Sequence, residues 1–292
     1  MKFYGGRFTL LPIHEVFYIK GNEEKIDLVL KILSTKGEFK VRRKVTVFNE
    51  PIFDENNVLI GGKFGRKSNR KIPTLKDGNL ANVPAVLYPF IFYIIDREEQ
   101  IILLQYNSDA FQKELAVFDY LTSILNKELW KEGLEVKISP LTSKGYFWEL
   151  VTEDAKIFSV RFILNSPNML GSVYNNLKDI LSYEKQESNA NRIEFARTND
   201  AGELKVKKTQ FNNEAVGWIE DGAGEWELVV KSSKTGNKKR KIKNTKQLAV
   251  FEADVDTEVE DNTYQNANDA DIIKKIKAKI DLCKYKIRGK NR

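Results

Sequence analysis

The order of apolar segments between residues 85 and 197 restricts the fold of this chain more than any other feature of its sequence. Hydrophobic spacing there predicts two strands, a helix, two strands, a second helix and a last strand. These segments are, in order, 85–95, 101–106, 111–130, 134–139, 155–164, 167–181 and 191–197. The links between consecutive strands are short, which favours antiparallel pairing. We therefore expect an α+β fold in which a mostly antiparallel sheet packs with helices.

The part of the chain before this region combines β-forming and loop-like segments. Residues 2–19 are rich in strand formers, and residues 39–48 alternate as a half-exposed strand. Between them, Asn22 is placed to cap a helix that runs to Leu33. Residues 49–83 contain four glycines and two prolines, which predicts a loop. A loop of this length is usually functional or mobile.

The sequence changes character near residue 200, where short segments separated by glycines replace the long apolar ones. Strands at 226–231 and 240–243 flank a basic turn and predict a hairpin. An amphipathic terminal helix, capped by Asp269 or Asp271, follows an acidic linker. The expected core domain, smaller C-terminal domain and acidic linker are 1–199, 200–292 and 252–271. The alternative is one mixed domain on which the terminal helix packs back.

Few side chains of this chain suit metal or covalent chemistry. The single cysteine, Cys283, excludes an intramolecular disulfide and multi-cysteine metal sites. The single histidine, His14, is tied to no serine or cysteine by a recognisable motif. The segment GGKFGR matches neither the P-loop nor the dinucleotide-binding spacing, so we expect no cofactor. No apolar run is long enough to span a membrane and no signal-peptide pattern opens the chain, so we expect a cytoplasmic protein.

Positive charge is concentrated in three short segments of the chain, whose net charge is +7. Residues 61–71 contain five cations and no acid, and residues 231–246 contain eight cations and no acid. Residues 272–292 contain nine cations against one acid, whereas residues 252–271 contain eight acids and no cation. Such basic clusters favour binding to nucleic-acid phosphates through counterion release.

The cations of these segments are the candidate nucleic-acid contacts. They are Lys63, Arg66, Lys67, Arg70, Lys71, Lys231, Lys234, Lys238, Lys239, Arg240, Lys241, Lys243, Lys246, Lys274, Lys275, Lys277 and Lys279. Nothing in the basic turn resembles a base-reading module, so we expect contacts directed to the backbone of duplex DNA. The simpler interpretation is that lysine runs are solvated faces. A basic amphipathic helix also suits anionic lipid, but the terminal helix contains no Trp or Phe.

A metal-dependent nuclease is the alternative function. Asp119, Glu135 and Lys137 loosely satisfy the pattern of carboxylates and a lysine that surrounds a divalent ion in such enzymes. Asp119, however, falls in the middle of the predicted helix, and a chain so rich in charge produces such triplets by chance. A third interpretation is a protein–protein or membrane-signalling adaptor that uses the acidic stretch 252–271.

Four segments carry a resemblance to a known family. They are the hairpin FIFYIIDREEQIILLQ, VKISPL at 136–141, KIFSVRF followed by NMLGSVYNNLKDILS, and the tail IIKKIKAKIDLCKYKIRGK. Over residues 84–183 and the tail, the chain resembles RexA-like phage-exclusion proteins, a DNA-binding family of abortive infection. The N-terminal block is also similar to uncharacterised bacterial families found near defence genes. The resemblance implies a dimeric, non-enzymatic, largely sequence-nonspecific DNA binder in phage defence, with the stripe of the tail helix as a dimer contact and a separate effector protein as a further partner.

Overall fold

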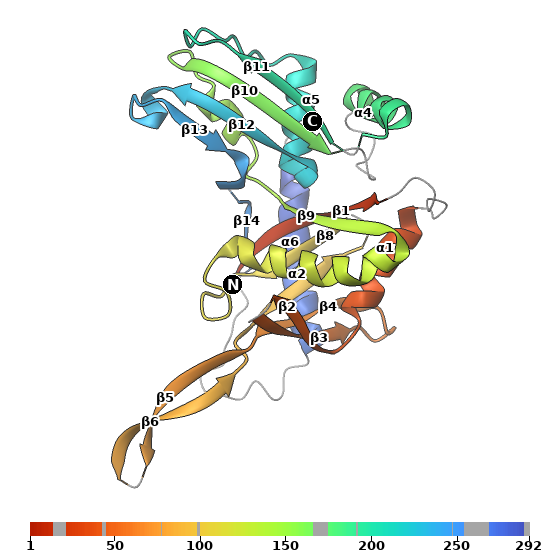
Figure 1. Ribbon diagram of the computed structural model, residues 1–292, viewed down its shortest axis with the longest axis vertical. Helices are drawn as coiled ribbons and strands as arrows, with labels where there is room; N and C mark the ends of the chain where they lie inside the picture. Colours follow the sequence, from red (N-terminus) through yellow and green to blue (C-terminus); the bar gives the residue numbers. More distant parts are fainter. Residues whose placement is uncertain are drawn as a thin grey trace. The chain divides into compact units, whose positions relative to one another are not determined.

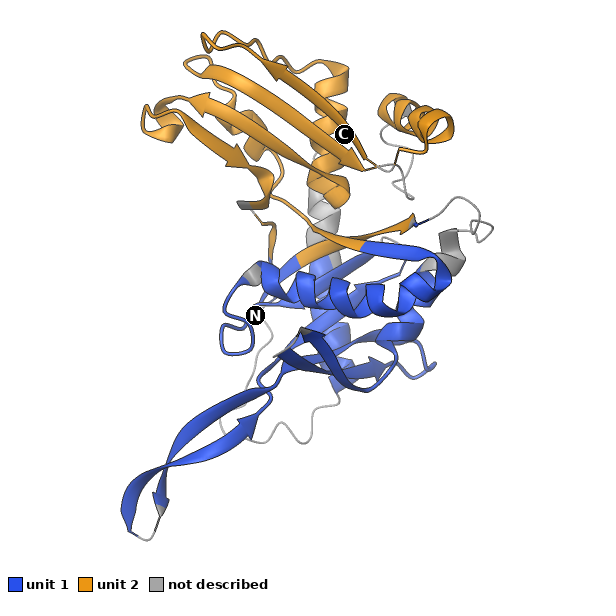
Figure 2. Ribbon diagram, in the orientation of Figure 1, with its two compact units in different colours: residues 1–4, 12–136, 251–292 blue, residues 5–11, 137–250 orange. Residues whose placement is uncertain are grey.

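The computed structural model describes residues 1–13, 22–42, 45–76, 78–97, 100–165, 175–190, 192–246, 248–253 and 269–288. The chain forms two compact units, each built from separate stretches of sequence (Figure 2). Unit 1 comprises residues 1–4, 12–136 and 251–292, and unit 2 comprises residues 5–11 and 137–250. The boundary that the sequence suggests at residue 199 therefore falls inside unit 2. The α+β class is confirmed, since antiparallel sheets are combined with helices.

The larger sheet has eight strands, in the order β14-β1-β8-β7-β4-β3-β2, with β9 also paired to β1 (Figure 1). Its strands are β1 (Lys2–Pro12), β2 (Gly37–Arg42), β3 (Val45–Phe53), β4 (Leu59–Arg66), β7 (Phe90–Asp96), β8 (Ile101–Gln105), β9 (Leu134–Pro140) and β14 (Val250–Glu252). β4 pairs antiparallel with β3 on one side and with β7 on the other. This β3-β4-β7 portion lies within unit 1 and positions the pocket described below.

Helices cover both faces of this portion of the sheet. The helices of unit 1 are α1 (Asn22–Leu33), α2 (Glu114–Leu129) and α6 (Asp269–Arg288). On the α1 face, Nδ2 of Asn49 donates to the Leu33 carbonyl at 2.7 Å. On the opposite face, α6 packs so closely that a Cβ at Gly61 would lie 3.1 Å from Cδ1 of Ile273. The apolar stripe of α6 is buried within its own chain at Ala270, Ile273, Ile276 and Ile280.

The prediction of a loop over 49–83 is wrong, because these residues form strands. They contribute to β3 and β4 and form β5 (Ser68–Lys76) and most of β6 (Asn79–Leu87). A Cβ at Gly61 would lie 2.1 Å from the Tyr93 carbonyl oxygen, so this glycine lets β4 lie close to β7 rather than marking a loop. The predicted strands 39–48 and 85–95 are each divided in two, between β2 and β3 and between β6 and β7.

β5 and β6 form a two-stranded ribbon that pairs with no other described strand and extends from the rest of unit 1 (Figure 1). Its side chains are exposed on both faces, and near its turn Leu75 and Leu80 form a cross-strand pair that is 71% and 89% exposed. At the base of the ribbon, Arg70 donates to the Asp109 carbonyl at 3.2 Å. This bond ties the ribbon to unit 1.

Unit 2 contains a four-stranded antiparallel sheet in the order β11-β10-β12-β13 (Figure 1). Its strands are β10 (Lys156–Asn165), β11 (Arg192–Thr198), β12 (Gly224–Lys231) and β13 (Arg240–Lys243). Its helices are α3 (Tyr146–Leu150), α4 (Asn175–Ser188) and α5 (Gln210–Trp218). The predicted basic hairpin is confirmed, because β12 and β13 pair antiparallel. None of the described helices of the chain has the length and apolar character needed to cross a membrane.

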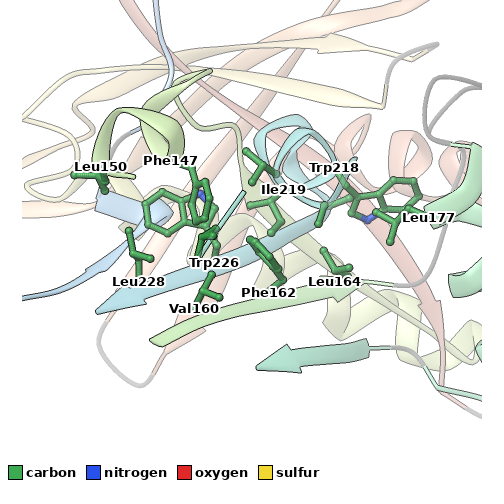
Figure 3. Close-up of a cluster of buried hydrophobic side chains, with 14 of the residues drawn as sticks. Phe147, Leu150, Val160, Phe162, Leu164, Leu177, Trp218, Ile219, Trp226 and Leu228 are labelled. Carbon is green, nitrogen blue, oxygen red and sulfur yellow. The ribbon is translucent and has the colours of Figure 1, made fainter. Parts of the chain in front are cut away.

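One face of this sheet carries the core of unit 2 (Figure 3). Phe162 and Trp226 point from the strands toward Phe147 of α3 and Trp218 of α5, and all four are buried. The ring centroids of Phe147 and Trp226 lie 5.2 Å apart. Because successive strand residues point to opposite faces, the residues that alternate with this core point away from it.

Candidate nucleic-acid interface

The face of the unit 2 sheet opposite the core is predominantly basic. Alternation along the four strands brings together residues that we call the open face. They are Lys156, Ser159, Arg161, Ile163, Arg192, Glu194, Ala196, Thr198, Glu225, Glu227, Val229, Lys231, Lys241 and Lys243. Six of these residues are cations and three are acids. The open face therefore has a net positive charge.

Two of the three acids of the open face, Glu194 and Glu227, are bound by cations of the same face, and the third, Glu225, pairs with Lys137 of β9. Glu227, whose side chain is only 10% exposed, pairs with Lys241 at 2.6 Å and with Lys243. Arg161 lies 3.8 Å from Glu227 and also donates from Nε to Glu194 at 3.0 Å. Hydrogen bonds from Lys241 and Lys243 hold the pKa of Glu227 below its ordinary value. These pairs fix the positions of several cationic side chains on the sheet.

Three lysines line the end of the open face nearest the hairpin turn. Lys156 of β10 and Lys231 of β12 lie directly opposite each other. Nζ of Lys239 lies 3.9 Å from the ring centroid of Phe158, the extra residue of a β-bulge in β10. None of the three lysines forms an ion pair within the described residues. This end of the sheet thus concentrates positive charge without a partner acid in contact.

The hairpin turn itself has a defined conformation. Ser232 and Thr235 form a capping box around a short 3-10 turn, and Gly236 then adopts a left-handed φ of 63°. Asp154 accepts a hydrogen bond from the Ser233 backbone N–H at 3.1 Å. Hydrogen bonds from Thr152 and Ser233 lower the pKa of Asp154 to about 2. The turn therefore presents its exposed lysines, Lys234 and Lys238, from a fixed backbone.

The sequence-predicted cations of segment 61–71 lie in unit 1 and are mostly bonded there. Lys63 pairs with Asp269 at 2.6 Å, and Lys67 pairs with Glu38 at 3.7 Å. Arg66, Arg70 and Lys71 form no ion pair among the described residues, although Arg70 donates to the Asp109 carbonyl. Segment 61–71 therefore belongs to unit 1, whereas the open face belongs to unit 2.

The remaining candidate cations divide between the hairpin and α6. Arg240 is exposed on β13, whereas the side chain of Lys246 lies outside the described part of the chain. On α6, Lys274 pairs with Glu55 at 3.0 Å. The α6 lysines that form no ion pair within the described ranges are Lys275, Lys277 and Lys279.

The acidic linker 252–271 is described only at its ends, because residues 254–268 lie outside the described residues, as does His14. At its start, Glu252 lies 3.7 Å from Lys2, and at its end Asp269 pairs with Lys63. Both bonds lie within unit 1, so the described acids of the linker neutralise cations of that unit.

The three residues of the predicted nuclease pattern do not form a metal site in the structure. Asp119 is exposed on α2, Glu135 is exposed on β9, and Lys137 pairs with Glu225 at 3.3 Å. Among the described residues, no group of three or more His, Cys, Asp or Glu side chains is placed to hold a metal ion.

Sequence reasoning missed part of the open face. Lys156, Arg161 and Arg192 are single cations within apolar strands rather than members of a basic run. Their one local signal is the polar half of the alternation in β10, where Arg161 falls between Val160 and Phe162 of the core. Long-range strand pairing brings these cations onto the same sheet face as the basic hairpin, and the local sequence does not show this pairing.

Comparison with known proteins gives no family assignment. No protein-family model matches the chain. No curated protein matches it either. A functional assignment therefore depends on the chemistry of the described side chains and on the resemblance given above.

Proposed function

We propose that this chain is a non-enzymatic protein that binds duplex DNA through the open face of unit 2, with little sequence preference, and acts in phage defence or exclusion. The observation that carries the proposal is the row of Lys156, Lys231 and Lys239. Lys156 and Lys231 lie on the paired strands β10 and β12, Lys239 directly precedes β13, and none of the three has a partner acid in contact within the described residues.

Repulsion between these lysines destabilises the folded sheet, and a bound anion reduces that repulsion. Like charges directly opposite each other on paired strands destabilise a sheet. A phosphate group placed between Lys156 and Lys231 relieves this repulsion, and each phosphate that a lysine neutralises releases condensed counterions. Lysine binds phosphate as a point charge, and contacts to phosphate position a protein on the duplex without selecting a sequence.

The biological part of the proposal depends on the resemblance to RexA-like phage-exclusion proteins over residues 84–183 and the tail. It includes a homodimer, since that family is dimeric, and a separate effector protein. The buried stripe of α6 packs within its own chain along 269–280, so a dimer needs another contact surface. Light scattering of the full chain measures the oligomeric state directly.

The test of DNA binding is a salt titration with two duplexes of unrelated sequence and equal length. We expect both to bind alike and log K to fall linearly with log salt. The double variant Lys156→Gln/Lys231→Gln should reduce the magnitude of that slope by about 1.8, since each lost phosphate contact contributes about 0.9. The control Lys113→Gln/Lys127→Gln changes the same charge on exposed positions of unit 1 and should leave the slope unchanged. A flat titration of the wild-type protein contradicts the proposal.

The test of phage defence is the efficiency of plating on a bacterial host that expresses the full chain. We expect the wild-type protein and the Lys113→Gln/Lys127→Gln control to reduce plating of at least one phage in a panel. The Lys156→Gln/Lys231→Gln variant should restore plating at equal expression. If this variant protects the host as well as the wild-type protein does, defence does not depend on DNA binding by the open face, and that part of the proposal is contradicted.

A further inference from the structure

Unit 1 contains a second candidate site, an open pocket of about 480 Å³ on the sheet face that also carries α6. This volume lies within the range of about 300–1,000 Å³ that is typical of small-ligand sites. Three aromatic side chains, Phe48, Tyr88 and Phe90, contribute to its walls. The ring of Phe90 is partly exposed, as is that of Tyr88.

Strand register explains why the sheet is hollow at this point. Phe48 of β3, Gly65 of β4 and Phe90 of β7 lie in one cross-strand row. Adjacent strands are about 4.8 Å apart, so the two aromatic residues stand on strands roughly 9–10 Å apart with no side chain between them. The pocket is therefore a slot between two rings, with the backbone of Gly65 as its floor.

Packing of the sheet does not require glycine at position 65. A Cβ at Gly65 would lie 3.5 Å from Cβ of Phe90 and 3.6 Å from the nearest carbonyl oxygens, which are ordinary van der Waals distances. In contrast, a Cβ at Gly61 would lie 2.1 Å from the Tyr93 carbonyl oxygen. The space above Gly65 is thus open because the side chain is missing, and a Cβ fits there at ordinary contact distances.

The polar groups of the pocket are already neutralised. Glu50 pairs with Lys36 at 2.6 Å, and Glu38 accepts a hydrogen bond from the Tyr88 hydroxyl and lies 3.7 Å from Lys67. These pairs leave the carboxylate oxygens able to accept further hydrogen bonds but without net charge to attract a cation.

Lysines stand close to the rings of the pocket. Nζ of Lys63 lies 5.4 Å from the ring centroid of Phe90, and Nζ of Lys67 lies 5.8 Å from that of Tyr88. Lys63 is itself paired with Asp269 and Lys67 with Glu38, so the paired charges around the pocket balance and do not favour a cationic ligand. A neutral, flat ring that carries amino groups and is attached to phosphate satisfies all three features: stacking surfaces, acceptors and flanking cations.

We propose that this pocket takes one unpaired nucleobase of a nucleic-acid strand, stacked between Phe48 and Phe90, while the cations of segment 61–71 contact the adjoining phosphates. Charge complementarity supports the strand rather than a free ring, because three cations of segment 61–71, Arg66, Arg70 and Lys71, form no ion pair among the described residues and the segment includes Gly65 itself. This site lies in unit 1 and is independent of the duplex contacts proposed for unit 2.

The test compares a labelled single-stranded 12-mer of mixed sequence with an abasic strand that has the same number of phosphates. We expect the abasic strand to bind about tenfold more weakly, because stacking on aromatic residues contributes strongly per base. Gly65→Leu fills the slot and should weaken binding of the 12-mer by about tenfold, to the level of the abasic strand. Phe90→Leu is a second variant that removes one ring and leaves the backbone of β4 unchanged.

The controls separate this inference from general effects and from the duplex proposal. Trp130→Leu removes a 63% exposed aromatic side chain of unit 1 away from the pocket and should not change binding. Gly65→Leu should retain duplex binding, whereas Lys156→Gln/Lys231→Gln should weaken duplex binding and keep the preference for the 12-mer over the abasic strand. Equal binding of the two strands, an unchanged Gly65→Leu variant, or binding of a trimethyllysine peptide in the same pocket overturns the inference.

Discussion

Glu220 accepts a hydrogen bond from the backbone N–H of Gly145, with 2.7 Å between Oε1 and the nitrogen. Glu220 belongs to a π-helical turn, Ile219–Ala223, that directly follows α5. Gly145 precedes α3 and has a left-handed φ of 84°. The bond therefore connects two helical elements of unit 2. Burial raises the pKa of the Glu220 carboxyl to about 7, although the Gly145 N–H and the nearby Lys144 act to lower it.

This relationship predicts that unit 2 loses stability as the pH rises from about 4.5 to about 7. In that window the folded state holds a proton on Glu220 that the unfolded state has released, so the free energy of unfolding falls with pH. Above pH 7 the carboxyl is ionised in both states and this loss is complete. Glu220→Gln keeps the acceptor for Gly145 and removes the charge, so we expect the free energy of unfolding at pH 8 to rise by about 1–3 kcal/mol.

The measurement is urea unfolding at pH 4.5, 6 and 8, followed by the fluorescence of the buried tryptophans. Glu149→Gln is a suitable control because Glu149 is an exposed residue of α3. The control should retain the pH dependence of the wild-type protein. The same pH dependence in Glu220→Gln would show that another group is responsible.

The opposed pair Lys156 and Lys231 predicts a trade-off between stability and binding. Lys156→Thr removes the repulsion and introduces a good strand former, so we expect it to stabilise the fold by about 0.2–1 kcal/mol while weakening duplex binding. Lys40→Thr is the matched control, since Lys40 is an exposed strand lysine opposite Thr46 and belongs to none of the basic segments. Chemical denaturation and binding isotherms on the same samples test both halves of the prediction. A variant that is less stable than the wild-type protein contradicts it.

Glu227 restrains cations of the open face. Its neutralisation should therefore lower the stability of the fold and raise the affinity for duplex DNA. Glu227→Gln leaves Lys241, Lys243 and Arg161 without their shared carboxylate. We expect a loss of about 1–3 kcal/mol in the free energy of unfolding, which is typical when hydrogen bonds to charged groups are removed. Binding to duplex DNA should tighten at low salt and approach the wild-type value at high salt.

The control for this prediction is Glu225→Gln on the same strand. Glu225 makes a single pair with Lys137 at 3.3 Å, and both partners are about one-third exposed. The same charge change there should alter stability much less. Weaker DNA binding in Glu227→Gln would indicate that the carboxylate holds the lysines in the geometry that binding needs.

Local periodicity in the sequence identifies the strands of unit 2 and the long helix of unit 1. The helix expected at 167–181 meets α4 only over 175–181, and residues 167–174 lie outside the described residues. The strand expected at 155–164 and the helix expected at 111–130 correspond closely to β10 and α2. The strands over 49–83 are missed because glycine and proline were interpreted as loop signals. In the structure, Gly61 allows β4 to lie close to β7. Pro73 lies in a ribbon that pairs with no other described strand. The structural role of these residues depends on which strand lies beside them, and the local sequence does not show that.

The candidate sites, too, could be predicted only in part from local sequence patterns. The basic turn is visible as a run of charge, but the pairing of Lys156 with Lys231 joins positions that are distant in the sequence. The pocket of unit 1 is even less visible, because Phe48, Gly65 and Phe90 come from three separate strands. Charge runs therefore locate the cations, whereas tertiary pairing decides which of them act together.

The last prediction concerns which basic element binds duplex DNA. The triple variants Lys231→Gln/Lys234→Gln/Lys238→Gln and Lys275→Gln/Lys277→Gln/Lys279→Gln carry the same charge change. The hairpin presents its lysines from a fixed turn, whereas α6 commits one side to the sheet and spreads its lysines over the remainder. We therefore expect the hairpin variant to reduce the salt slope by about 2.7 and the α6 variant to reduce it by less than half as much. Binding isotherms at several salt concentrations give the slopes, and light scattering establishes that both variants keep the wild-type oligomeric state. If the α6 variant loses duplex binding while the hairpin variant keeps it, the tail helix is the binding element and the open face is not.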